Sequence, residues 1–75
     1  MNRADVRARM ARTLGAEAEE VTDEAVLRDL VAESFKLVEM VIDLQETFGL
    51  RITQDQLLGV HTVGDLLDRV VGRDA

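Results

Sequence analysis

The sequence predicts an all-α fold, a small bundle of helices. Apolar residues recur at helical spacing in three segments, near residues 4–14, 35–48 and 62–71. Proline is absent, so glycines supply the stops between these segments. The 75 residues are 47% hydrophobic, which suits one small domain with a core, residues 1–75. Because only 3% are aromatic, this core must be aliphatic.

The first helix is expected over residues 4–14. Val6, Met10 and Leu14 are spaced four residues apart, so they form one apolar stripe along a helix. Gly15 follows at a position where glycine commonly ends a helix. The segment therefore has both a buried side and a defined end.

The middle helix is expected to be the central element and to end near Phe48 and Gly49. Its polar side chains gather on one side: Lys36, Glu39, Asp43, Glu46 and Thr47. Apolar residues fill the remaining arc of roughly 220°. So wide an apolar face predicts burial against several neighbouring elements.

The segment before this helix allows two interpretations. Apolar residues from Val26 to Val31 keep helical spacing, which favours one continuous helix over residues 23–48. Residues 16–33 could instead form a long loop, although unstructured loops of that length are uncommon unless they are functional. Between Gly49 and Thr62 there is room for one short helical turn, near residues 55–58, with Thr53 or Asp55 as its cap.

The last helix is expected over residues 62–71. Its apolar positions follow one face: Val63, Leu66, Leu67, Val70 and Val71. Thr62 and Asp65 have the spacing of a capping box, and Gly72 follows as a terminating glycine.

Charge and composition exclude several classes of function. With 15 acidic and nine basic residues, the net charge is −6, which opposes binding to nucleic acid or anionic membranes and favours basic partners. Cysteine is absent and His61 is the only histidine, so we expect no metal site and no thiol catalysis. The N-terminus does not resemble a signal peptide and no run is long enough to span a membrane. We therefore expect a cytoplasmic protein.

Several strings, in register over nearly the whole chain, resemble an acyl carrier protein. They are Glu19 to Thr22, Leu30 to Phe35, Val38 to Val41, Leu44 to Phe48, Ile52, and Thr62 with Val63. The resemblance implies three main helices plus one short helix, with a long, packed but irregular first loop over residues 16–33. Leu27 or Leu30 would then hold that loop on the bundle, in place of the continuous helix.

The resemblance also implies that Ser34 receives phosphopantetheine from coenzyme A by a phosphopantetheinyl transferase. Glu33 and Phe35 flank it where the family usually has Asp and Leu, and Val31 and Lys36 are further departures from the family pattern. These changes lie in the site that the transferase recognises. They favour a specialised, polyketide-type carrier over a housekeeping fatty-acid carrier.

Ser34 has a simpler interpretation, because a serine that opens a helix is often only an N-cap. The chain would then be a small acidic interaction domain. Nothing in the sequence couples His61 to Ser34 as a base, so a hydrolase is not expected. A carrier of aminoacyl or peptidyl groups is a further alternative, but such domains usually have glycines where Val31 and Ala32 stand.

The same resemblance implies a non-enzymatic, monomeric carrier that meets acyl-loading and chain-extending enzymes with basic patches. Its docking residues would be Lys36, Glu39, Asp43 and Glu46, the last three forming an acidic stripe on the exposed side of the helix. Residues expected mainly in the core are also candidates for lining an acyl chain: Met40, Val41, Leu44, Phe48, Ile52 and Leu67. Gln45 lies at the border of the apolar side.

Overall fold

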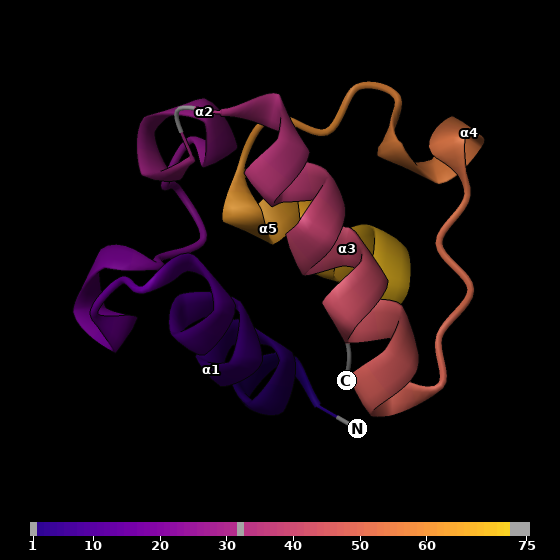
Figure 1. Ribbon diagram of the computed structural model, residues 1–75, viewed down its shortest axis with the longest axis horizontal. Helices are drawn as coiled ribbons and strands as arrows, with labels where there is room; N and C mark the ends of the chain where they lie inside the picture. The colour runs from indigo at the N-terminus through magenta and orange to yellow at the C-terminus, as the bar shows by residue number, and fades with distance from the viewer. Residues whose placement is uncertain (1, 32, 73–75) are drawn as a thin grey trace.

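Three long helices carry the fold, with shorter helical turns between them. The computed structural model describes residues 2–31 and 33–72. Its helical elements are α1 (Arg3–Leu14), the 3-10 turn η1 (Ala18–Glu20), α2 (Leu27–Leu30), α3 (Ser34–Phe48), α4 (Gln54–Leu57) and α5 (Val63–Val70). Helix α1 packs against α3 and α5, and α4 packs against α5 (Figure 1). The predicted all-α class is confirmed.

Three predicted signals lie at ends of the long helices, but the Asn2 side chain that caps α1 was not predicted, and no side chain caps the start of α3. Gly15 and Gly49 end α1 and α3 with φ of 69° and 65°, in the left-handed region that glycine adopts without strain. At the start of α5, the Thr62 hydroxyl accepts a hydrogen bond from the Asp65 amide at 3.1 Å, and Asp65 accepts one from the Thr62 amide at 3.1 Å. The short turn α4 is capped by Thr53, not by Asp55.

Residues 16–31, with Glu33, form the packed, irregular loop that the resemblance implies, and the continuous helix over 23–48 is wrong. Backbone hydrogen bonds hold the loop on the start of α5: the Leu27 amide donates to the His61 carbonyl, and the Val63 amide to the Ala25 carbonyl, both at 2.9 Å. Leu27 is 5% exposed and Leu30 is partly buried. These hydrogen bonds compete with the backbone bonds of a continuous helix. The local spacing of apolar residues does not reveal such long-range contacts.

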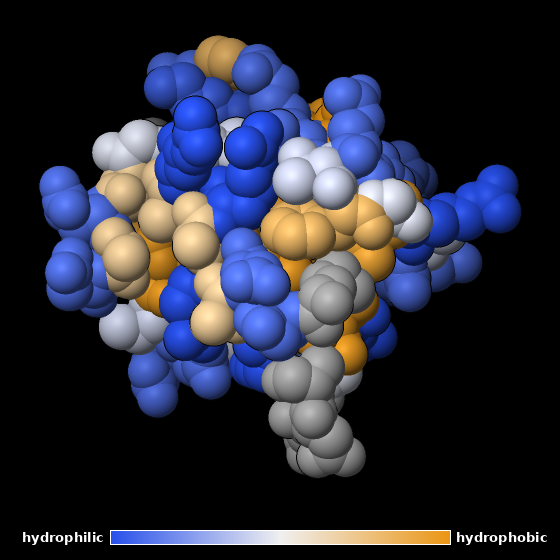
Figure 2. All heavy atoms as spheres, turned by 90° about the horizontal axis from the view of Figure 1, so that it is seen from below, coloured by the Kyte–Doolittle hydropathy of each residue, from blue (hydrophilic) through white to orange (hydrophobic). Residues whose placement is uncertain are grey.

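The core is aliphatic, as the composition predicts. Its wholly buried side chains come from α1, the first loop, α3 and α5: Val6, Met10, Val21, Met40, Leu44, Val63, Leu66 and Leu67. Seen from below the view of Figure 1, hydrophilic side chains cover most of the molecule and apolar atoms show between them (Figure 2).

The expected burial of the whole apolar arc of α3 is wrong for three residues. Phe35, Val38 and Ile42 are 56%, 57% and 45% exposed. Met40 and Leu44 on the same helix are wholly buried in the core that α3 shares with α1 and α5, while these three side chains stay largely at the surface. An apolar strip therefore remains at the surface.

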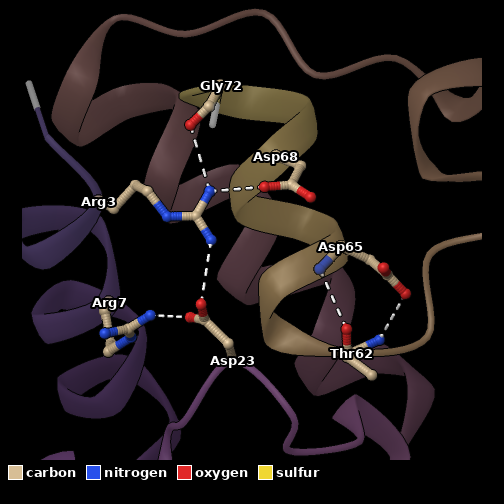
Figure 3. A network of polar contacts seen from close by, with 7 residues as sticks. All are labelled: Arg3, Arg7, Asp23, Thr62, Asp65, Asp68 and Gly72. Carbon is tan, nitrogen blue, oxygen red and sulfur yellow. Dashed lines mark hydrogen bonds and ion pairs between the residues drawn. The ribbon is translucent and has the colours of Figure 1, made fainter. Parts of the chain in front are cut away.

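Charged side chains fasten the start of α1 to the first loop and to α5 (Figure 3). The Arg3 guanidinium donates to Asp68 Oδ1 at 2.7 Å and to the Gly72 carbonyl at 3.2 Å, and it contacts Asp23 at 3.4 Å. Arg7 also pairs with Asp23. The network joins segments that are far apart in the sequence. Within the described residues, none of the helices has the length and apolar character to cross a bilayer.

Candidate functional site

Ser34 is the first residue of α3, and it does not cap the helix. The capping position belongs to Glu33, whose backbone is extended (φ −110°, ψ 127°) and whose side chain caps nothing. Ser34 is exposed, and its hydroxyl makes no hydrogen bond with the residues that the structure describes. The interpretation of Ser34 as only a helix cap is therefore wrong, and its hydroxyl is available for chemistry.

A hollow of about 380 Å³ opens beside Ser34, between α2 and α3. It is lined by Leu27, Arg28, Val31, Ser34 and Leu37, and we call it the α2–α3 hollow. Leu27 and Val31 are buried and form an apolar floor, while Arg28 and Ser34 are exposed at the edge. The site thus combines a free hydroxyl, an apolar surface and one cation.

A second hollow, of about 280 Å³, lies between α3 and the segment that contains α4. Its lining is mostly apolar: Leu37, Val38, Val41, Ile42, Gln45, Ile52, Gln54 and Leu57. Leu37 borders both hollows. Gln45 fixes the edge of this α3–α4 hollow, because its Oε1 accepts a hydrogen bond from the Ile52 amide at 2.9 Å.

The six acyl-lining candidates separate into three groups. Val41 and Ile52 line the α3–α4 hollow. Met40, Leu44 and Leu67 are wholly buried in the core and border neither hollow. Phe48 is half-buried against the core.

The predicted acidic stripe is divided in the structure. Lys36, Glu39 and Glu46 are exposed, as expected. Asp43 instead faces α1, with its side chain 25% exposed; Arg9 donates to both of its oxygens at 2.7 Å. The hydrogen bond from Arg9 holds the pKa of Asp43 below its ordinary value, and it raises the pKa of Arg9. The expectation that Asp43 lies on the free side of the helix was wrong.

Sequence reasoning missed the apolar strip and Arg28. At about 100° per residue, Phe35, Val38 and Ile42 lie between Gln45 on one side and Glu39 on the other. Arg28 is the single basic residue between Arg12 and Lys36, in an otherwise acidic stretch. A single basic residue in an acidic stretch is a signal by which the sequence could have indicated Arg28. Within the described ranges, no cluster of three or more potential metal ligands occurs.

Comparison with known proteins identifies the family. A family profile described as "Phosphopantetheine attachment site" matches residues 4–70. An acyl carrier protein of Saccharopolyspora erythraea is 45% identical over 60 residues, which cover 79% of this chain and 63% of the relative. Acyl carrier proteins of Exiguobacterium sibiricum and Thermotoga maritima are 37% and 33% identical, over 88% and 87% of this chain and 85% and 82% of theirs.

The residues at the start of α3 fit a phosphopantetheine group. The Ser34 hydroxyl is exposed, and the first turn of α3 contains no acidic side chain, although the exposed Glu33 directly precedes it. Amides at a helix N-terminus and the helix dipole favour such an anion. With the family profile and the relatives in agreement, the chain belongs to the acyl carrier protein family, whose cofactor is covalently attached phosphopantetheine.

Proposed function

We propose that this protein carries acyl groups as thioesters on a phosphopantetheine arm attached to Ser34, in fatty-acid or polyketide-type biosynthesis. The observation that carries the proposal is the exposed Ser34 hydroxyl, which is not used as a cap and lies beside the α2–α3 hollow. The thiol at the end of the arm supplies the thioester chemistry. The protein supplies the point of attachment, a recognition surface and a shelter, and is not itself a catalyst.

The recognition surface in this proposal is the outer face of α3, formed by Phe35, Val38, Ile42, Glu39 and Glu46. Its apolar residues are exposed, and the two carboxylates lie together along one border of them. A basic enzyme surface is steered by the carboxylates and gains affinity by covering the apolar strip. The partners are the phosphopantetheinyl transferase and the acyl-loading and chain-extending enzymes. Lys36 lies beside this face and selects among them.

The shelter in this proposal is the α3–α4 hollow. Val41, Ile52 and Leu57 give it an apolar lining, and none of the described residues that border it is charged. Apolar acyl chains are favoured in such surroundings because their surface leaves water. Glu33 and Phe35 complete the motif that the transferase meets around Ser34. The cytoplasmic location and the monomeric state stay predictions from the sequence.

Intact mass tests the attachment directly. The protein is incubated with coenzyme A and a broad-specificity phosphopantetheinyl transferase, and we expect a gain of one phosphopantetheine group. Ser34 is the single serine in the chain, so Ser34→Ala should show no gain while keeping its helical circular dichroism spectrum. Thr53→Ala, which removes a hydroxyl from the cap of α4, is the matched control and should load normally. An unchanged mass for the unsubstituted protein would overturn the proposal.

A further inference from the structure

We propose that Arg28 binds the phosphodiester of the arm and so holds the first part of the arm in the α2–α3 hollow. The proposal rests on attachment of the arm to Ser34. It assigns a positioning role to a residue outside the flanking motif, and a location to the part of the arm nearest the protein.

The first step of the argument is position. Ser34 and Arg28 border the same hollow, one from the start of α3 and the other from α2. Helix α2 is held in place because Leu27, the residue next to Arg28, is buried and donates its amide hydrogen to the His61 carbonyl at 2.9 Å. A phosphate on the Ser34 oxygen would therefore stand at the edge of a hollow that already contains a guanidinium.

The second step is the state of that guanidinium. Arg3, Arg7 and Arg9 are all committed to ion pairs with aspartates. Arg28 is exposed and forms no ion pair within residues 2–31 and 33–72. Lys36 is also near Ser34 in the sequence, but it lies about 200° around α3 from it, on the opposite side. Arg28 is thus the cation that shares a hollow with Ser34, and guanidinium binds phosphate oxygens with paired hydrogen bonds.

The third step is the chemistry of the arm. Its phosphodiester is joined through one methylene to a carbon that carries two methyl groups, so an anion stands next to a compact apolar unit. The α2–α3 hollow has matching groups in the same order: Arg28 at the edge for the phosphate, and the buried side chains of Leu27 and Val31 as a floor for the apolar unit. Among residues 2–31 and 33–72, the lining of the α3–α4 hollow includes no charged side chain, so it suits the acyl end of the arm better than the phosphate end. Leu37 borders both, so the two hollows adjoin at this residue.

The experiment compares apo and loaded forms of three proteins: the unsubstituted chain, Arg28→Gln and Arg51→Gln. Arg51→Gln is the control, because Arg51 is exposed and follows the other end of α3. Intact mass first establishes that each is fully loaded; failure at this stage counts against the attachment and not against the role of Arg28. Methyl resonances are then compared between apo and loaded forms, together with the phosphorus resonance of the phosphodiester. The methyl groups are those of Leu27, Val31 and Leu37 at the α2–α3 hollow, and of Val41, Ile52 and Leu57 at the α3–α4 hollow.

We expect loading to shift the Leu27 and Val31 methyl resonances in the unsubstituted chain and in Arg51→Gln. Arg28→Gln should lose most of these shifts and should move the phosphorus resonance, and added salt should act on the unsubstituted chain in the same direction. Two outcomes would overturn the proposal. Shifts of equal size in Arg28→Gln would show that Arg28 does not hold the arm, and shifts confined to Val41, Ile52 and Leu57 would place the arm in the α3–α4 hollow from its start.

Discussion

The two sides of α3 differ in their contacts with the rest of the protein. The side that faces α1 contains Met40 and Leu44, which are wholly buried, and Asp43, which is paired with Arg9. The outer face carries apolar residues and carboxylates that remain exposed. Carboxylates on one helix therefore differ in their surroundings: Asp43 fastens the helix to the bundle, and Glu39 and Glu46 stay exposed.

The comparison predicts that core truncation has the largest effect on stability. Leu44→Ala should lower the free energy of unfolding by about 2–5 kcal/mol, because it removes wholly buried methyl groups and leaves a cavity. Ile42→Ala, two residues away on the outer face, should cost on the order of 0.5 kcal/mol. Chemical denaturation of both variants measures the difference. Equal losses would mean that the two sides are packed alike.

Asp43→Asn is expected to have the next largest effect, and that effect should depend on pH. The pKa of Asp43 is lowered in the folded protein, chiefly by the hydrogen bond from Arg9. A lowered pKa stabilises the fold above the ordinary aspartate pKa of about 3.9, and this contribution is lost as the pH falls through the folded pKa. The variant should therefore be less stable than the unsubstituted protein near pH 7, and the gap should close below about pH 4.

The control for this experiment is Asp55→Asn. Asp55 is exposed on α4 and forms no ion pair within the described part of the chain. Denaturation curves between pH 3 and pH 7 should give almost the same stability for Asp55→Asn and the unsubstituted protein. A gap for Asp43→Asn that persists at low pH would show that its carboxylate charge is not what holds α3 to α1.

Local signals predicted the ends of the helices well, and distant contacts account for the errors. Gly15, Gly49 and the Thr62–Asp65 box each act on neighbouring residues, so their effect is visible in the sequence. The pairing of Asp43 with Arg9 joins residues far apart in the sequence, and neither residue alone indicates the other. The first loop was identified from a resemblance, because the hydrogen bonds that form it reach across to α5. The positions of the hollows depend on which part of α3 stays uncovered by other elements. The sequence of a single segment does not determine this.

Gln45 lies at the border between the two sides of α3. Its substitution should lower the free energy of unfolding by less than the Leu44 and Asp43 substitutions do. Gln45→Ala removes the acceptor of the Ile52 amide and should cost about 1 kcal/mol, the usual contribution of one such hydrogen bond. Gln45→Glu keeps an acceptor oxygen and should cost less. Hydrogen exchange at the Ile52 amide gives a local measurement, which should be faster in Gln45→Ala. Equal exchange in both variants would mean that the bond does not hold the edge of the α3–α4 hollow.

The smallest effect on stability is expected from reversing the charges of the outer face. Glu39→Lys with Glu46→Lys should change the free energy of unfolding by less than about 1 kcal/mol per site, because both side chains are exposed. The same pair should slow phosphopantetheine transfer several-fold at low salt, since steering by a basic enzyme surface is weakened. Added salt should narrow the difference in transfer rate from the unsubstituted protein.

The control is Glu17→Lys with Glu19→Lys, which changes the net charge equally in the first loop and should leave the transfer rate nearly unaltered. If both double variants slow transfer alike, the net charge of the protein controls the encounter and the outer face of α3 has no special part in it. A decrease in the transfer rate that does not depend on salt would instead indicate structural damage near Ser34.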